Sequence, residues 1–520
     1  MNILLLSSLA SAALAAGQTH KTDCQHLTAP NVPGATVLSI NGTERWNYTV
    51  PALRPFLLSP VSGLNFCDVT VLLTHAGAKD QVTVKVWLPL QDWNGRFQAN
   101  GGSAYAAGEF DLTLGPTVKA GYSSSSTDAG VGFNPETPSP WALKADGSVD
   151  FDALINFSYR SIHDMAVVGK ELTAQFYGTK PKYSYWNGCS TGGRQGMVAA
   201  QRYPDLFDGI SVGAPAINWA KYVLAEQWPQ VIMQQEQTFP SSCELKFFSD
   251  TAIAECDGLD GVKDRIINDP EKCHYTPYQS VGQEVDCDGK KVTITKSAAT
   301  VVANALQGPV DTSGRPLWYG LNAGAPLDSL VNTTAAVNGT LAGYPFFVND
   351  EWIKYFVVRN PDYNTLEINA TTFVDLFWKS YIDYDSTIGT DEADLSSFHQ
   401  HGGKLLMWQG LSDQLIFPGG TVDYRTRVER LMGGRHKTND FFRLFFAPGV
   451  DHCGFGSTIG AIPDDPFGAL VNWVEHGKAP DSIPATVNDE AKAKRIVCAY
   501  PQRAEYIGGD VNSAASFRCA

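Results

Sequence analysis

The sequence predicts an α/β fold built on a mostly parallel sheet, with a large insertion between two of its strands. Three observations support this prediction. Strand-like and helix-like segments alternate along the chain, glycine-rich turns follow two of the strands, and the alternation stops between residues 216 and 399. Because strands that alternate with helices usually form a parallel sheet covered on both faces, a layered α/β domain is expected.

The strands and helices are predicted from the spacing of their apolar residues. Residues 81–88 alternate β-branched and polar side chains, as a half-buried strand does. From Ile162 to Phe176, apolar or small residues recur on one helical face. The other expected elements are a strand leading into the glycine-rich loop 100–102, strands at 183–186, 210–214, 404–409 and 441–447, and a helix at 195–203.

Residues 216–399 differ from the rest of the chain. They are rich in aromatic residues, cysteines and glycosylation sequons, and they contain few apolar runs of strand length. We therefore expect residues 17–215 and 400–520 to form one α/β domain, with residues 216–399 inserted into it as a second domain.

Composition and charge restrict the class of protein. The 520 residues are 43% hydrophobic and 18% charged, which excludes a disordered or collagen-like chain. The formal net charge of −15 disfavours binding to nucleic acid or to anionic membrane surfaces. After the N-terminus, no uninterrupted apolar run reaches the ~18 residues of a membrane-spanning helix.

The N-terminus resembles a secretory signal. Residues 1–16 are mostly apolar and end near Ala13-Leu14-Ala15, a small-x-small cleavage pattern, although no Lys or Arg precedes the apolar run. The alternative is an N-terminus that remains part of the mature protein. Six N-x-Ser/Thr sequons agree with a secreted glycoprotein, at Asn41, Asn47, Asn156, Asn332, Asn338 and Asn369.

The cysteines also indicate an oxidising compartment. There are ten, an even number, and they are scattered without a C-x-x-C pair. This pattern favours up to five disulfides over a zinc ribbon. They are Cys24, Cys67, Cys189, Cys243, Cys256, Cys273, Cys287, Cys453, Cys498 and Cys519.

The segment 188–192, Gly-Cys-Ser-Thr-Gly, has the pattern G-x-S-x-G. It lies between a predicted strand and a predicted helix, which is the strand–turn–helix context of a nucleophilic serine. Such a turn requires small neighbours, and it raises the hydroxyl above the sheet at a helix N-terminus. We therefore predict that Ser190 is a nucleophile; the alternative is a βα loop in which Ser190 only caps the helix.

A nucleophilic serine requires a histidine base and a carboxylate that orients it. In this architecture the chain order is Ser, Asp, His, with the acid and base in loops after late strands. Asp413 follows the strand 404–409 and His452 follows the strand 441–447, whereas Asp451 is a less favourable competitor for the acid role. The remaining histidines considered are predicted to be packing or surface residues: His20, His26, His163, His274, His399 and His401.

Two cysteines flank the predicted catalytic residues. Cys189 precedes Ser190, and Cys453 follows His452. If they pair, one disulfide joins the nucleophile turn to the histidine loop and holds the two groups in register. The alternative is that each cysteine pairs elsewhere.

These motifs together resemble the fungal tannase and feruloyl esterase family. The resemblance rests on residues 186–196 around Gly-Cys-Ser-Thr-Gly-Gly-Arg, on residues 408–413 ending in Asp413, and on Pro-Gly-Val-Asp-His-Cys-Gly at 448–454. It extends from about Cys24 to Cys519. One departure is Phe455, where the family tends to continue with glycine.

The resemblance implies an α/β-hydrolase fold in which residues 216–399 form a lid domain. It places oxyanion donors at the amide of Thr191 and at an amide of the Gly101-Gly102 pair, without deciding between the two glycines. It also implies the disulfides Cys189–Cys453, Cys24–Cys67, Cys256–Cys273 and Cys498–Cys519, which leaves Cys243–Cys287 as the remaining pair.

The resemblance further implies a structural calcium site in the lid. Residues 256–266 carry three aspartates separated by glycines, and hard cations bind such oxygen clusters. The spacing differs from an EF-hand, and an acidic turn is the alternative. The implied ligands are the carboxylates of Asp257, Asp260 and Asp264 and the carbonyls of Val262 and Ile266.

The expected function is that of a secreted serine carboxylic ester hydrolase with calcium as its only cofactor. The resemblance implies substrates that are esters of aromatic acids, with feruloyl esters of plant cell-wall polysaccharide first and galloyl esters of tannins second. A non-catalytic, calcium-stabilised carbohydrate-binding protein is the alternative from another class. Transfer of the acyl group to an alcohol is a further alternative.

Overall fold

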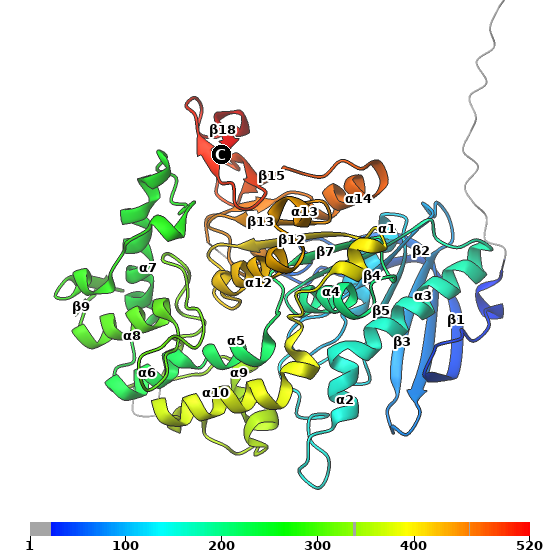
Figure 1. The fold of residues 1–520 in the computed structure, drawn as a ribbon, viewed down its shortest axis with the longest axis horizontal. Coiled ribbons are helices and arrows are strands. Elements are labelled where there is room, and N and C mark those ends of the chain that lie inside the picture. Colours follow the sequence, from blue (N-terminus) through cyan, green and yellow to red (C-terminus); the bar gives the residue numbers. More distant parts are fainter. Residues whose placement is uncertain (1–21, 336–339, 457) are drawn as a thin grey trace, which may run out of the picture.

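The fold was analysed in a computed structural model that describes residues 22–335, 340–456 and 458–520 (Figure 1). The predicted signal segment 1–16 and the sequon at Asn338 lie outside these residues. A nine-stranded sheet forms the centre. In spatial order its strands are β1 (Ala35–Val50), β2 (Val61–His75), β3 (Val82–Pro89), β5 (Ser123–Thr127), β4 (Arg96–Asn100), β6 (Tyr183–Cys189), β7 (Gly209–Gly213), β12 (Lys404–Gly410) and β13 (Phe442–Ala447).

The sheet is parallel from β5 to β13, as expected, and antiparallel from β1 to β5. Every predicted strand and helix is present, with bounds that differ by at most four residues. The largest difference is α4 (Thr191–Arg202), which begins directly after Ser190 rather than at Gln195. The long β1–β2 hairpin and the central strand β5 were not predicted from the sequence.

Helices cover both faces of the sheet. On one face, apolar residues of α3 (Ser161–Tyr177), α4 and α12 (Pro418–Leu431) share a core with alternate residues of β3 and β12. The other face is covered by α1 (Phe110–Lys119) and α14 (Pro466–His476). The remaining elements here are α11 (Ser396–Gln400), α13 (Arg435–Asn439), a small sheet of β14 (Ala461–Pro463), β15 (Ser482–Val487) and β16 (Lys494–Cys498), and the pair β17 (Ala504–Tyr506) and β18 (Phe517–Cys519).

The segment between β7 and β12 leaves the sheet and returns to it, since these two strands are parallel neighbours. Figure 1 shows this segment, in green to yellow, beside the sheet. It is mainly helical, and none of the helices in the described part of the chain is long and apolar enough to cross a membrane. Its helices are α5 (Trp219–Ala225), α6 (Trp228–Glu236), α7 (Ser242–Cys256), α8 (Lys296–Gln307), α9 (Phe347–Trp352) and α10 (Ala370–Tyr384), with short hairpins β8 (Glu284–Cys287)–β9 (Lys290–Thr293) and β10 (Thr333–Ala335)–β11 (Leu341–Gly343).

The inserted segment shares its hydrophobic core with residues 105–157 of the first part of the chain. Trp219 of α5 packs against Tyr105, with ring centroids 6.0 Å apart. Phe356 packs against Trp141 at 5.6 Å. The part of the first region that makes this contact includes α2 (Phe151–Ile155), and the π-helical turn Asn156–Arg160 follows it directly. The insertion is therefore fixed to the α/β part by a continuous apolar contact.

Candidate active site

Ser190 occupies a strained turn between β6 and α4. Its backbone has φ 61° and ψ −122°, a combination that L-residues rarely adopt. The neighbouring glycines permit this turn, because a Cβ on Gly188 would lie 2.6 Å from the carbonyl carbon of Gly192. A Cβ on Gly193 would lie 2.6 Å from the carbonyl oxygen of Gly213 on β7. The turn therefore has the geometry of a nucleophile elbow.

The structure brings Asp413 and His452 together. Asp413 follows β12, His452 follows β13, and the Nδ1 atom of His452 lies 3.1 Å from each carboxylate oxygen of Asp413. Asp413 has no solvent exposure. Its Oδ1 atom accepts hydrogen bonds from the backbone amides of Leu415 (3.0 Å) and Ile416 (2.9 Å), and its Oδ2 atom accepts one from Gln409 Nε2 (3.4 Å). These donors stabilise an anionic carboxylate at this buried position.

Asp451, the competitor for the acid role, has a different position. Its carboxylate accepts hydrogen bonds from the backbone amides of Gly456 (3.1 Å) and Thr458 (3.3 Å). Asp451 thus holds the turn that follows His452. The geometry favours Asp413 as the residue that orients the imidazole.

The predicted disulfide Cys189–Cys453 is present, with its Cα atoms 6.1 Å apart. It joins the residue before Ser190 to the residue after His452 across a sequence separation of 264 residues. No hydrogen bond joins Ser190 Oγ to His452 in this structure, although both residues are described. Catalytic hydrogen bonds are often long without substrate and shorten when it binds.

The predicted oxyanion donors lie beside the elbow. In the described part of the chain the amide of Thr191 has no acceptor, as is usual in the first turn of a helix. The amides of both glycines already donate: Gly101 N–H to the carbonyl of Asn187 (3.3 Å) and Gly102 N–H to Gln195 Oε1 (3.1 Å). A role for either glycine therefore requires that it exchange its present acceptor for the substrate oxygen.

Arg194 is a residue near the site whose place sequence reasoning did not predict. Its guanidinium is fully buried and donates to the carbonyls of Phe157 (3.1 Å) and Ser158 (2.8 Å) in the π-helical turn. Burial lowers the pKa of Arg194 to about 10. The arginine joins the nucleophile helix α4 to the turn 156–160. Its position in the Gly-Gly-Arg motif, directly after the nucleophile turn, was the sequence feature that could have indicated this role.

The other four predicted disulfides are also present. All ten cysteines are paired, and none is free. The pairs are Cys24–Cys67, Cys243–Cys287, Cys256–Cys273 and Cys498–Cys519.

The aspartates predicted to bind calcium lie close to one another at the end of α7. Burial, together with the negative charges of Asp264 and Asp257, raises the pKa of Asp260 to about 6. Part of this carboxylate set is already used, because Asp264 Oδ2 accepts from Arg495 (2.7 Å) and Asp257 Oδ1 accepts two backbone amides. Within the described residues, no three His, Cys, Asp or Glu side chains form a ready metal centre. The carboxylate and carbonyl oxygens are thus of the kind that calcium binds, but in the described residues the carboxylates do not point at one common position.

The sequons differ in accessibility. Asn41, Asn47 and Asn369 are exposed and Asn332 is half-buried. Asn156 is fully buried, its Nδ2 atom donates to Asp80 (2.7 Å), and its Oδ1 atom accepts from Arg160 (2.6 Å). A glycan on Asn156 is incompatible with this packing, so the prediction of glycosylation there is wrong for the folded chain.

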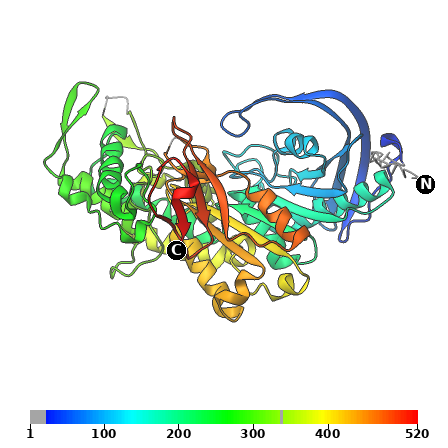
Figure 2. The ribbon, with the colours of Figure 1, turned by 90° about the horizontal axis from the view of Figure 1, so that it is seen from above.

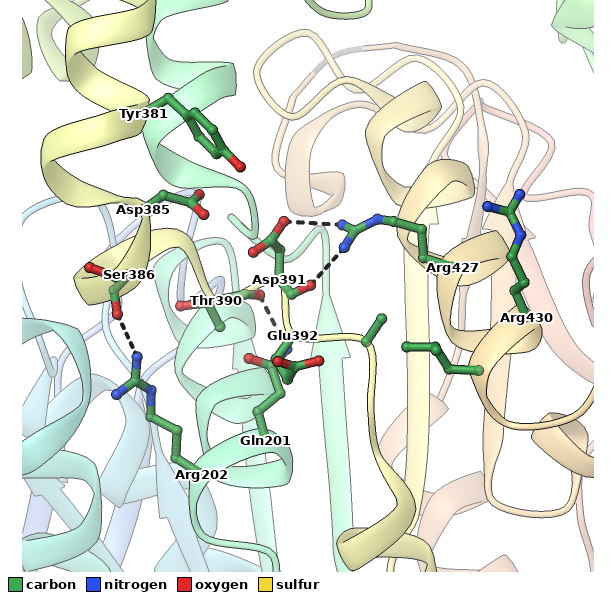
Figure 3. Close-up of a pocket in the computed structure, with 12 residues that line it drawn as sticks. Gln201, Arg202, Tyr381, Asp385, Ser386, Thr390, Asp391, Glu392, Arg427 and Arg430 are labelled. Carbon is green, nitrogen blue, oxygen red and sulfur yellow. Dashed lines mark hydrogen bonds and ion pairs between the residues drawn. The ribbon is translucent and has the colours of Figure 1, made fainter.

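A separate open groove of about 720 Å³ lies at the far end of α4 from Ser190 (Figure 3). In this groove Arg202 donates to the carbonyl of Ser386 (2.8 Å), and Arg427 pairs with Asp391 (3.2 Å). Burial and the charge of Asp391 raise the pKa of Asp385 to about 6. None of the predicted site residues lines this groove.

A serine on a strained elbow, with a histidine–carboxylate pair held beside it by a disulfide, defines a serine hydrolase of the α/β-hydrolase class. The model of the family described as "Tannase and feruloyl esterase" matches residues 67–520. The chain belongs to this family of carboxylic ester hydrolases.

Individual relatives support this assignment over nearly the whole chain. A protein named "Probable feruloyl esterase" from Arthroderma benhamiae is 44% identical over 525 residues, covering 100% of this chain and 97% of that protein. The solved structure of tannin acyl hydrolase from Aspergillus niger has a TM-score of 0.85 and 26% identity, covering 94% of this chain and 92% of the other. Feruloyl esterase B from Aspergillus oryzae has a TM-score of 0.77 and 26% identity, covering 94% and 97%.

Proposed function

We propose that this chain hydrolyses esters of aromatic carboxylic acids, with feruloyl and related hydroxycinnamoyl esters of plant cell-wall polysaccharide as its main substrates. The observation that carries the proposal is the contact of His452 with the buried Asp413, on a loop joined by Cys189–Cys453 to the Ser190 elbow. The 44% identity to a protein named as a feruloyl esterase supports the acyl group proposed.

In the proposed mechanism, His452 Nε2 removes the proton of Ser190 as the serine oxygen attacks the ester carbonyl. Asp413 holds the imidazole through Nδ1 and stabilises its positive charge. The C–O bond to the alcohol then breaks, and His452 returns the proton to the departing oxygen. A water molecule, deprotonated by His452, attacks the acyl-serine, and the free acid leaves as Ser190 regains its proton.

Stabilisation of the oxyanion is proposed for backbone amides. The Thr191 amide is the first donor, and an amide of the Gly101-Gly102 pair is the second after it gives up its present acceptor. Such donors contribute about 10²–10³-fold in rate each, because they face the charge that develops in the transition state.

The test is hydrolysis of methyl ferulate and methyl gallate by purified protein, with Ser190→Ala as the control. Preference for ferulate that disappears in the variant is the expected result. Preference for gallate would instead make the protein a tannase, which the likeness to the Aspergillus niger tannin acyl hydrolase structure favours as the second candidate. Absence of Ser190-dependent hydrolysis of either ester would contradict the proposal.

Two other activities are separated by simple measurements. A serine-directed fluorophosphonate probe labels Ser190 if the site is catalytic, and it does not if the chain is a non-catalytic carbohydrate-binding protein. Analysis of products in the presence of added alcohol distinguishes hydrolysis from acyl transfer.

We also propose that Asp257, Asp260 and Asp264, with the carbonyls of Val262 and Ile266, hold a structural Ca²⁺. The observation in favour is that burial, together with the negative charges of Asp264 and Asp257, raises the pKa of Asp260, since a bound cation would stabilise these carboxylates in their charged form. Thermal unfolding in CaCl₂ and in EDTA tests this. A higher Tm with calcium, lost in Asp260→Asn, is expected because ligands stabilise the state they bind. An equal Tm in both conditions would contradict it.

We propose secretion as the location, with residues 1–16 removed and glycans on the exposed sequons. The five disulfides support an oxidising compartment. Sequencing the N-terminus of protein from the culture medium, and its mass before and after endoglycosidase, test these points.

A further inference from the structure

Two exposed phenylalanine rings from opposite ends of the chain meet beside the histidine loop. The ring centroids of Phe56 and Phe455 are 5.2 Å apart with an interplanar angle of 73°. Phe455 is held close to the base, because its backbone amide donates to the carbonyl of His452 (3.3 Å). Despite their contact, the side chains remain 48% and 42% exposed. Such exposure of two large rings at one point leaves apolar surface available to a ligand.

The position of Phe56 is fixed by the loop that joins β1 to β2. Leu53 and Leu57 form two backbone hydrogen bonds across this loop, of 3.0 and 2.8 Å. Leu57 also packs against the buried cluster that contains Phe66 and Trp87. Figure 2 shows the blue β1–β2 hairpin arching towards the C-terminal part of the chain, where Phe455 lies. The hairpin thus presents Phe56 from an ordered loop.

Two neighbouring residues of the loop are also apolar and exposed. Leu53 is 50% exposed and Leu58 is 66% exposed, on either side of Phe56. A patch that is open to solvent suits a ring that keeps one side in water. A sugar ring has this character, because its C–H faces are apolar and its hydroxyl groups point outward from the edge.

The reaction indicates which half of an ester lies against this patch. His452 returns its proton to the departing alcohol, so groups beside His452 lie on the alcohol side of the scissile bond. We propose that Phe56 and Phe455 form an aromatic subsite for the sugar that carries the acyl group. This inference rests on the proposed ester hydrolysis and extends it to the alcohol half of the substrate. Phe455 is then a residue that sets specificity.

The test compares two esters of one acid: methyl ferulate and ferulate linked to an arabinose-containing xylo-oligosaccharide. Phe455→Ala and Phe56→Ala are expected to lower kcat/KM about tenfold on the sugar ester, mainly through KM, and less than about twofold on methyl ferulate. Phe455→Trp should restore most of the loss. Leu431→Ala, which truncates a side chain that is 63% exposed beside the groove at the far end of α4, is the matched control.

Equal losses on both esters, or no loss on either, would overturn the subsite. Calorimetry of the Ser190→Ala variant with the oligosaccharide that lacks its feruloyl group measures binding to the subsite without catalysis. That binding should weaken about tenfold in the Phe455→Ala background. If wild type cleaves neither ester while this binding persists, the proposed function fails and the sugar subsite stands; if ester cleavage persists without such binding, only the subsite fails.

Discussion

His452 Nδ1 lies 3.1 Å from both carboxylate oxygens of Asp413, and that carboxylate is fully buried. The residue adjacent to the histidine in the chain, Asp451, turns instead to the amides of Gly456 and Thr458. The aspartate nearest to His452 in sequence is therefore not the one that contacts its imidazole. Mutation of each aspartate distinguishes their roles.

We predict that Asp413→Asn lowers kcat about 10⁴-fold, because an amide favours the wrong tautomer of the imidazole. Asp451→Asn should lower kcat less than about tenfold and act mainly on stability, since it removes only acceptors of a turn. Steady-state kinetics and thermal unfolding of both variants check this. A larger loss of kcat in Asp451→Asn than in Asp413→Asn would reverse the assignment of the acid.

Replacing Cys189 and Cys453 together with serine should reduce both stability and activity. The bridge closes a loop with a sequence separation of 264 residues, and chain entropy predicts that its removal lowers the free energy of unfolding by about 5–6 kcal/mol. Since the bridge also holds nucleophile and base in register, kcat should fall about 10²-fold. Chemical denaturation and kinetics measure the two effects.

The matched control is the double serine variant of Cys498 and Cys519. This bridge, with a sequence separation of 21 residues, joins β16 to β18 and touches no predicted catalytic residue. Its removal should lower the free energy of unfolding by about 3 kcal/mol and leave kcat unchanged. An equal loss of kcat in both variants would show that the active-site bridge acts only through global stability.

A buried ion cluster should make stability depend on pH. His75 lies between Asp80 (2.6 Å) and Asp164 (2.9 Å), with Arg160 and His163 beside the two carboxylates. Burial alone lowers the pKa of His75, but its hydrogen bonds to the two carboxylates outweigh burial and raise it. The charged histidine therefore stabilises the fold fully below about pH 6.5, and this contribution is lost as pH rises through the folded pKa.

His75→Gln should remove this dependence. The urea midpoint of the wild type is expected to fall between pH 5.5 and 8.5 by more than that of the variant. The corresponding difference in the free energy of unfolding is roughly 1.4 kcal/mol for each unit by which folding raises the pKa of His75. Parallel pH profiles for the two proteins would contradict a charged His75. On the acid side, the pKa of Asp80 is lowered to about 2 by hydrogen bonds that outweigh burial, so its contribution persists down to about pH 4.

Gly101→Ala should damage the site directly. A Cβ there would lie 2.4 Å from the Cα of Gly192 and 2.6 Å from Gln195 Oε1, so the oxyanion loop and the nucleophile helix must separate. We expect the free energy of unfolding to fall by about 1–3 kcal/mol and kcat to fall at least about tenfold. Gly258→Ala is the control for kcat, because it lies outside the catalytic residues and its nearest contact would be 3.5 Å away. Unchanged kcat in Gly101→Ala would show that this close approach is not required.

The elements that carry apolar periodicity could be predicted from sequence, and β5 shows why others could not. Residues Ser123–Thr127 form a fully buried central strand without one apolar side chain. Their hydroxyl groups are satisfied by distant partners: Ser123 donates to the carbonyl of Arg96 (3.1 Å) and Ser125 to that of Met165 (3.2 Å). Such compensation depends on tertiary contacts, so a hydrophobic pattern does not contain it.

The same division holds at the candidate site. Ser190, Asp413 and His452 were predictable because strand–turn–helix context and chain order restrict them. The support given by Arg194 was not, since its guanidinium contacts the carbonyls of Phe157 and Ser158, which lie 37 and 36 positions away in the sequence. Asn156 shows the reverse error: its sequon is genuine as a sequence pattern, but the packing buries it.

The core shared by residues 105–157 and the inserted segment has a consequence for how this enzyme meets its substrate. Swinging the insertion open as a rigid flap would expose Trp219, Trp352 and their partners to water. The inserted segment is therefore fixed relative to the α/β part, and any surface that it offers to a substrate is shaped before the substrate arrives. An engineer who wishes to exchange the inserted segment for that of a relative must transplant residues 105–157 together with it.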